Sequence, residues 1–182
     1  MTKQAILIID LQNEYLPTGK LPLVGIEKAV ENSAKVIADG REKGIQVIHI
    51  QHIFANEEMP VFEPGSVGIE IQTTVAPAKD EVVIVKNYVN SFLDTNLKQL
   101  LEENGVKELI VAGAMSHLCV DAAVRAAADF GYKVTVIHDA CATMDLEFNG
   151  VKVPAANVHA TLMAAFAFAY AEVISTDDYL NK

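Results

Sequence analysis

The chain has 182 residues, of which 51% are hydrophobic and 21% charged, enough for a compact fold with a sizeable core. Its net charge of −10, without any run of lysine and arginine, argues against nucleic acid and anionic membranes as partners. Two cysteines are too few for a disulfide framework, and neither a secretory signal nor an apolar run of about 18 residues is present. We therefore expect one cytoplasmic domain, residues 1–182, that acts on a small molecule.

Six short apolar runs predict strands, and helical patterns lie between them. The predicted strands are residues 5–9, 45–50, 81–85, 109–112, 133–138 and 172–175. Helical spacing is found in residues 26–38, 97–101 and 158–168, and a further helix ends at Gly131. Because the strands are apolar on both faces, this alternation predicts an α/β fold. We expect a doubly wound, Rossmann-like, six-stranded parallel sheet with helices on both faces.

The stretch from Leu109 to Gly131 predicts a strand, a tight turn and a helix, with Cys119 in the first turn of that helix. Free backbone N–H groups and the positive end of the helix dipole favour a thiolate at this place. The same N–H groups could receive an oxyanion. The alternative is a small buried thiol that packs the helix on the sheet.

Two further polar residues follow apolar strands, Asp10 after the first and Lys86 after the third. Ligands of such sheets bind beyond the carboxyl ends of the strands, so we expect both side chains near Cys119. A carboxylate can accept the thiol proton, and an ammonium group can stabilise the negative charge. Taken singly, Asp10 could be a turn residue and Lys86 a solvated strand end.

Three motifs follow one another in the order of a known superfamily. They are Ile8–Asn13 with Tyr15, Lys86 with Ser91-Phe92, and Gly113–Val120, extended by Gly131–Val134 and Asp139–Thr143. With them the sequence resembles the isochorismatase-like cysteine hydrolases, which include nicotinamidases and N-carbamoylsarcosine amidohydrolases. The resemblance implies an Asp-Lys-Cys triad of Asp10, Lys86 and Cys119, and a homo-oligomer. It also implies a cis peptide bond between Ala114 and Met115, and an oxyanion hole made by the N–H groups of Met115 and Cys119.

The implied activity is hydrolysis of a small amide-type C–N bond through a thioester on Cys119. Asp10 would act as base, then acid, then base. A non-catalytic, ligand-binding member and an isochorismatase-type vinyl ether hydrolase are the alternatives. Receiver domains and Asp-x-Asp phosphotransferases need a second carboxylate where this chain has Gln12, and residues 11–15 lack the glycine of a nucleotide-binding loop.

Nicotinamidases carry an Asp-x-His metal cluster just after the second strand, where this chain has Gln51–Phe54. His52 stands in place of the Asp and Phe54 in place of the His, and one histidine without a carboxylate is a poor metal site. We therefore predict no metal and no cofactor, with His49 a strand histidine and His52 part of the pocket wall.

The expected walls of the pocket are mostly apolar. They are Tyr15, Phe54, Phe92, Met115 and Leu118. Such walls favour a small, uncharged amide, ureide or lactam as substrate. The loop 55–78, with three prolines, and the segment 145–150 are candidates for a lid. For Cys141 we favour a structural thiol.

Overall fold

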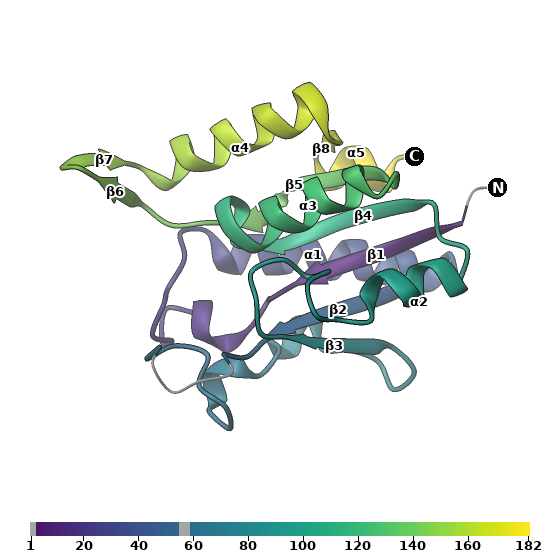
Figure 1. The fold of residues 1–182 in the computed structure, drawn as a ribbon, viewed down its shortest axis with the longest axis horizontal. Coiled ribbons are helices and arrows are strands. Elements are labelled where there is room, and N and C mark those ends of the chain that lie inside the picture. Colours follow the sequence, from purple (N-terminus) through teal and green to yellow (C-terminus); the bar gives the residue numbers. More distant parts are fainter. Residues whose placement is uncertain (1–2, 55–58) are drawn as a thin grey trace.

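The structure, a computed structural model, describes residues 3–54 and 59–182. Its centre is one parallel sheet with strand order β3-β2-β1-β4-β5-β8 (Figure 1). The strands are β1 (Gln4–Ile9), β2 (Gln46–His52), β3 (Val82–Lys86), β4 (Glu108–Ala114), β5 (Lys133–Ala142) and β8 (Glu172–Ile174). The chain runs outward from β1 to β3 and returns to the other side of β1 with β4, so the order reverses between β1 and β4. The predicted doubly wound six-stranded sheet is confirmed.

Helices cover both faces of the sheet. On one face lie α1 (Ile26–Glu42) and α5 (Thr176–Leu180), and on the other α2 (Leu97–Glu103), α3 (Asp121–Asp129) and α4 (Ala155–Ala169) (Figure 1). Three short 3-10 turns complete these layers: η1 (Asn13–Tyr15), η2 (Val67–Ile69) and η3 (Thr73–Val75). None of the helices formed by the described residues is long and apolar enough to cross a membrane.

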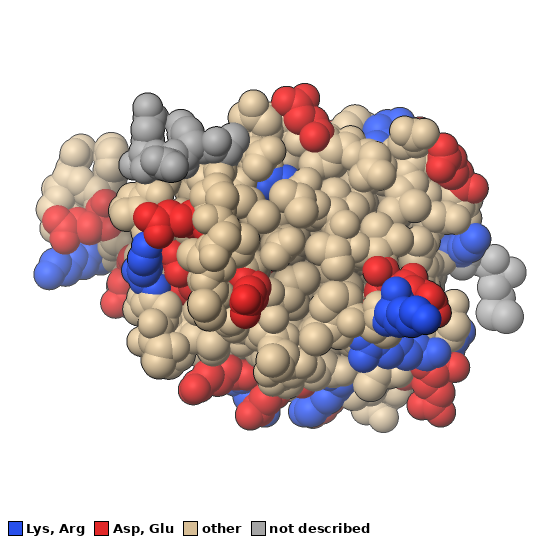
Figure 2. Space-filling model, turned by 90° about the horizontal axis from the view of Figure 1, so that it is seen from below, with Lys and Arg blue, Asp and Glu red and all other residues tan. Residues whose placement is uncertain are grey.

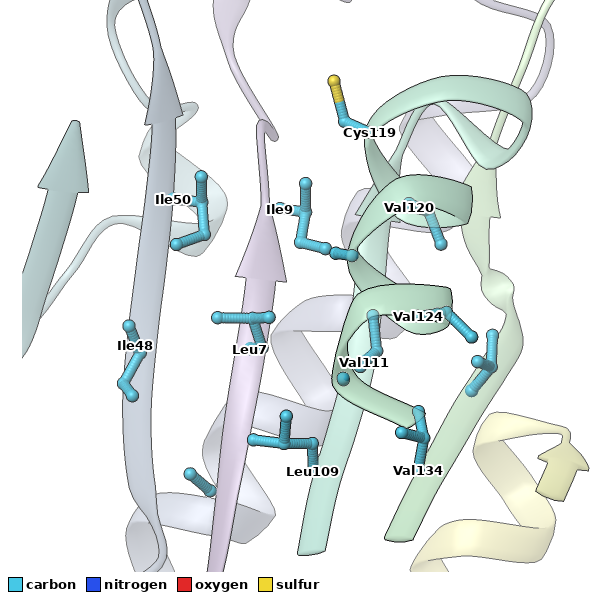
Figure 3. Close-up of a cluster of buried hydrophobic side chains, with 14 of the residues drawn as sticks. Leu7, Ile9, Ile48, Ile50, Leu109, Val111, Cys119, Val120, Val124 and Val134 are labelled. Atoms are coloured by element: carbon cyan, nitrogen blue, oxygen red, sulfur yellow. The ribbon is translucent and has the colours of Figure 1, made fainter. Parts of the chain in front are cut away.

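The central strand β1 shows why the sheet forms. Its alternate side chains enter two separate hydrophobic clusters, with Leu7 and Ile9 on the side of α3 and Ile6 and Ile8 on the side of α1. All four are at most 1% exposed, as expected for a strand covered on both faces. Figure 3 shows Leu7 and Ile9 in the first cluster, with the sulfur of Cys119 at its upper end. The core therefore ends directly beneath the predicted nucleophile.

Two regions differ from the predicted elements. Within the candidate lid 145–150, residues 146–148 form β6 (Leu146–Phe148), which pairs with β7 (Val151–Val153) in an antiparallel hairpin. The hairpin projects from the body of the molecule next to α4 (Figure 1). The second difference is at Cys119, which lies in a π-helical turn, η4 (Ser116–Val120), and not in the first turn of α3. The helical segment therefore opens with a π-helical turn that contains Cys119 and continues directly into α3.

Gly113 brings β4 close to β1. Its φ is +135°, and a Cβ atom added here would lie 2.1 Å from the carbonyl oxygen of Ile9. Only glycine can take this backbone conformation and this close approach. The register of β4 against β5 shifts at the same place, between Val111 and Gly113. The glycine therefore determines how near η4, which follows β4, comes to the end of β1.

Charged side chains of both signs are scattered over the surface. On the face seen in Figure 2, most lie toward the margin, and uncharged residues fill much of the centre. Among the residues described, this face carries no continuous basic area of the kind that nucleic-acid binding requires.

Candidate active site

The structure brings Asp10, Lys86 and Cys119 together at the carboxyl ends of the central strands. The Lys86 Nζ atom lies 2.8 Å from Asp10 Oδ2 and 3.3 Å from Cys119 Sγ. Asp10 is 0%, Lys86 1% and Cys119 5% exposed, so the three groups share a desolvated site. The chain turns sharply at Asp10, whose φ is +51°, a conformation that aspartate tolerates better than most residues.

Burial and the neighbouring charges determine the protonation of the site. Burial raises the pKa of Asp10, and the ammonium group of Lys86 opposes this effect. Burial disfavours the charged form of Lys86, but the negative charge of Asp10, followed by Cys119, raises its pKa overall. Burial, followed by the charge of Asp10, raises the pKa of Cys119. In the resting site the ammonium group of Lys86 is therefore the ion-pair partner of Asp10, and the thiol of Cys119 is protonated.

This state corrects the expectation that the helix end favours a resting thiolate. Cys119 lies in a π-helical turn beside a carboxylate, and desolvation outweighs the stabilisation that Lys86 offers. A thiolate at this place requires transfer of the thiol proton to a base. Both carboxylate oxygens of Asp10 are buried, and neither accepts a hydrogen bond in the part of the chain that the structure describes, although Oδ2 lies 2.8 Å from Lys86 Nζ. The carboxylate has room for a proton on Oδ1.

The turn before Cys119 contains the implied oxyanion hole. The peptide bond between Ala114 and Met115 is cis, in agreement with the resemblance. The carbonyl oxygen of Met115 accepts from the N–H groups of Leu118 and Val120, at 3.1 and 3.2 Å. Within the described ranges 3–54 and 59–182, the N–H group of Met115 donates to no protein acceptor. One of the two expected donors is therefore unoccupied.

His52 contacts the triad through Lys86. It ends β2 directly opposite Lys86 in the register of β2 and β3, and its Nδ1 atom lies 3.1 Å from Lys86 Nζ. Burial, followed by the charge of Lys86, lowers the pKa of His52 to about 3. This contact was not predicted, because it depends on the pairing register of two strands, which the sequence does not specify.

Aromatic rings form one side of the site. The His52 ring stands edge-on to Phe54 at 4.5 Å and to Phe62 at 5.2 Å, and Phe62 lies 5.2 Å from Tyr15. Burial, followed by the charges of Cys119 and Asp10, raises the pKa of Tyr15 well above its usual value. Tyr15 and Phe54 both join this aromatic group, and their role as substrate walls stays a prediction. Phe62 was missed because it sits in a weakly patterned loop.

The other predicted wall residues differ in their positions. Met115 is buried and Leu118 is 39% exposed, both beside Cys119 in the chain. Phe92 does not join this group. Its ring packs 5.3 Å from Phe130, at the far end of α3 from Cys119. The proximity of Phe92 to Lys86 in sequence was misleading, because the loop after β3 turns this side chain into the hydrophobic core.

The described part of the loop 55–78 is held in place by glutamine side chains. The Gln12 amide donates to the carbonyl oxygens of His52 and Ile69 and accepts from the N–H group of His52, each at 2.8 Å. Gln72 donates to the carbonyl oxygen of Gln12 at 3.0 Å. This part of the loop is a fixed wall. Residues 55–58, the remainder of the candidate lid, lie outside the described residues.

Other conspicuous side chains are bound elsewhere. His49 pairs with Glu81 at 3.1 Å on the opposite face of β2, and the buried Cys141 is a free thiol in β5. A surface cavity of about 930 Å³ lies at the amino ends of β1 and β2, and no cysteine lines it. The described residues include no group of three histidine, cysteine or carboxylate side chains able to hold a metal ion. The residues at the nicotinamidase position do not fit a metal, since His52 faces an ammonium group and Phe54 offers no donor.

Comparison with known proteins identifies the fold and its relatives. The model of the isochorismatase domain matches residues 4–178. YddQ of Bacillus subtilis, an uncharacterized isochorismatase family protein, is 46% identical over 97% of this chain and 98% of its own length. A crystal structure from Oleispira antarctica, provisionally named an isochorismatase hydrolase, has a TM-score of 0.96 and 48% identity. It covers 100% of this chain and 97% of that one.

Some relatives carry a named activity. A streptothricin hydrolase of Streptomyces noursei is 34% identical over 79% of this chain and 51% of its own length. An N-carbamoylsarcosine amidase of Arthrobacter is 28% identical over 72% of this chain and 56% of its own length. By name, the first is a hydrolase and the second an amidase.

The hydrogen bonds of the Gln12 side chain, here called the glutamine clamp, predict that substitutions of two neighbouring residues differ in their effect on stability. Gln12→Ala removes three hydrogen bonds, two buried and one partly buried, and should lower the free energy of unfolding by about 2–4 kcal/mol. Asn13→Ala, the control, removes one exposed hydrogen bond to Val67 and should change it by less than about 1 kcal/mol. Urea unfolding of both variants measures the difference. Equal losses would show that the clamp does not hold the loop.

Proposed function

Because the chain belongs to the isochorismatase family, whose members are hydrolases and include amidases, we propose that it is a metal-independent cysteine hydrolase of small amide-type C–N bonds. One observation carries the proposal. A single buried ammonium group, that of Lys86, lies within 3.3 Å of both a carboxylate and a thiol. This arrangement supplies a base, a nucleophile and a positive charge between them.

In the first half of the proposed reaction, Asp10 accepts the thiol proton and the sulfur of Cys119 attacks the carbonyl carbon. The C–N bond then breaks, and protonated Asp10 gives its proton to the departing nitrogen. In the second half, Asp10 deprotonates a water molecule that attacks the thioester. The acid product leaves, and the proton returns to the sulfur. Burial that raises the pKa of Asp10 makes both of its protonation states accessible during this cycle.

The oxyanion of each tetrahedral intermediate would accept hydrogen bonds from the N–H groups of Met115 and Cys119. The unoccupied N–H group of Met115 supports this role. Lys86 remains charged throughout and stabilises first the carboxylate and then the thiolate.

The wall residues favour an uncharged substrate. Tyr15, Phe54 and Phe62 offer rings, and the charge of Lys86 is already matched by that of Asp10. A substrate carboxylate would find no unmatched cation among these residues. A small carboxamide, ureide or lactam is therefore the proposed substrate class.

We also propose that the protein is a homo-oligomer that associates through α4 and the β6–β7 hairpin. The 15 residues of α4 include no aspartate, glutamate, lysine or arginine. Phe168 is 92%, Phe148 77% and Val151 63% exposed on these elements. In a chain with a net charge of −10, an uncharged helix α4 allows two copies to meet with little local repulsion, and the two exposed charges of the hairpin strands, Glu147 and Lys152, are of opposite sign.

The hydrolase proposal predicts the result of a substrate screen. Ammonia release is measured across carboxamides, N-carbamoyl compounds and cyclic imides. Cys119→Ala and Cys119→Ser should lower turnover of any substrate found by at least about 10³-fold, because the first removes the attacking sulfur and the second replaces it with a weaker nucleophile. Cys141→Ala, which removes the other buried thiol, should retain activity. Near-normal turnover by Cys119→Ala would refute the mechanism, and vinyl ether cleavage without ammonia release would favour the isochorismatase alternative.

Metal independence is tested separately. Dialysis of the active enzyme against a chelator should leave its rate unchanged, because its proposed base and electrophilic groups are side-chain and backbone groups. Elemental analysis that finds one tightly bound zinc or iron ion per chain would contradict this prediction.

The proposed interface predicts the mass in solution. Light scattering should give a multiple of 19.7 kDa for the wild-type protein. Phe168→Glu should shift it toward the monomer, because it places a charge on each copy at the contact. Val67→Glu, a control at a residue 68% exposed outside this surface, should not. A monomeric wild-type protein would disprove the proposal.

A further inference from the structure

More acceptor atoms lie near the buried ammonium group of Lys86 than it has N–H donors. Besides Asp10 Oδ2 at 2.8 Å and Cys119 Sγ at 3.3 Å, His52 Nδ1 and the carbonyl oxygen of Tyr88 each lie 3.1 Å from Nζ. An ammonium group carries three N–H donors, so one of these four contacts lacks a hydrogen bond at any moment. In the structure the hydrogen bonds run to His52 Nδ1, the Tyr88 carbonyl oxygen and Cys119 Sγ. Asp10 Oδ2 lies at ion-pair distance without a hydrogen bond.

The geometry determines which nitrogen of His52 carries its proton. Lysine has no acceptor, so the Nδ1 atom that faces it must present a lone pair, and the ring proton lies on Nε2. His52 stays neutral across the physiological range, because burial and the adjacent cation lower its pKa to about 3. It therefore acts toward Lys86 as a neutral acceptor.

His52 is also held in a fixed position. It is 4% exposed, and Gln12 binds both its N–H and its carbonyl group at 2.8 Å. The rings of Phe54 and Phe62 stand edge-on to the imidazole on their side of the site. An acceptor fixed in this way also fixes the N–H group that points at it.

From this geometry we infer that His52 is a positioning residue for Lys86. Together with the carbonyl group of Tyr88, it holds two N–H groups, so that the third stays directed at Cys119 beside Asp10. This inference rests on the proposed reaction. When the thiol proton passes from Cys119 to Asp10, the carboxylate becomes a neutral acid and the sulfur a thiolate. Lys86 keeps its charge and all three protons, and the N–H group already directed at the sulfur then donates to the thiolate.

The groups around Lys86 divide into two that change charge during the proposed reaction and two that stay neutral, and His52 is one of the neutral pair. In the described part of the chain, Asp10 from β1 and Cys119 from η4 are the ionisable groups that contribute negative charge at its ammonium group. His52, from β2, and the Tyr88 carbonyl, from the loop after β3, are neutral. The two neutral acceptors do not change during the reaction, so they can hold the ammonium group while the other two exchange charge.

The test uses three substitutions of His52 that place an acceptor differently. Asn offers an oxygen near the position of Nδ1, Gln offers one near the position of Nε2, and Leu offers none. The readout is the rate of Cys119 alkylation by iodoacetamide, followed by mass spectrometry across a pH series, which needs no substrate. His52→Leu and His52→Gln should slow alkylation by roughly tenfold, because the ammonium group is no longer directed at the thiolate. His52→Asn should stay near the wild-type rate.

The same variants predict an effect on turnover once a substrate is known. In His52→Gln, kcat should fall with little change in KM. The alkaline limb of the kcat/KM profile should move about one unit to lower pH, because the charged form of Lys86 has lost an acceptor. His49→Leu, which removes the other buried histidine of β2, should leave the alkylation profile unchanged.

The outcomes separate the two proposals. Equal rates in all His52 variants, or equal losses in Asn, Gln and Leu, would overturn the role of His52. If His52→Leu does not fold, the contrast between Asn and Gln decides. If that contrast appears but no substrate is hydrolysed, the positioning of Lys86 is supported and the hydrolase proposal fails.

Discussion

The ion pair between Lys86 and Asp10 is the interaction on which the rest of the site depends. A buried ammonium group is stable only if an opposite charge and hydrogen-bond acceptors surround it. Here each acceptor comes from a different part of the chain: Asp10 after β1, His52 at the end of β2, and Cys119 in η4. The parallel sheet brings these points together at one edge, so the charge that would serve chemistry also depends on correct strand pairing.

The loop beside the Lys86–Asp10 pair is also held in a fixed position. The aromatic side of the site rests on residues 59–78, and glutamine amides bind that segment to the ends of β1 and β2. Glutamine can donate and accept at once, so one side chain satisfies several buried carbonyl groups of irregular backbone. The aromatic side of the site is thus held by hydrogen bonds within the folded chain.

The sequence predicted the sheet, its helices and the proximity of Asp10, Lys86 and Cys119, because strand periodicity and strand ends are local signals. Contacts that depend on register or on loop direction were not predictable in the same way. His52 reaches Lys86 through the pairing of β2 with β3, and Phe92 turns away from the site after β3. The expected resting thiolate is disfavoured for another reason: burial and the neighbouring carboxylate of Asp10 raise the pKa of Cys119 more than the helix end lowers it. The β6–β7 hairpin was missed because its strands have three residues each.

The glycine at the end of β4 has a consequence for variation in this protein. A methyl group at Gly113 would collide with the backbone of β1 one residue before Asp10 and act as a wedge between the two strands. Asp10 follows β1 and Cys119 follows β4, so a separation of these two strands would also separate the proposed base from the proposed nucleophile. A change at a residue that touches neither of them would thus widen the gap that the thiol proton must cross, and inactivation could arise without any alteration to the reacting groups.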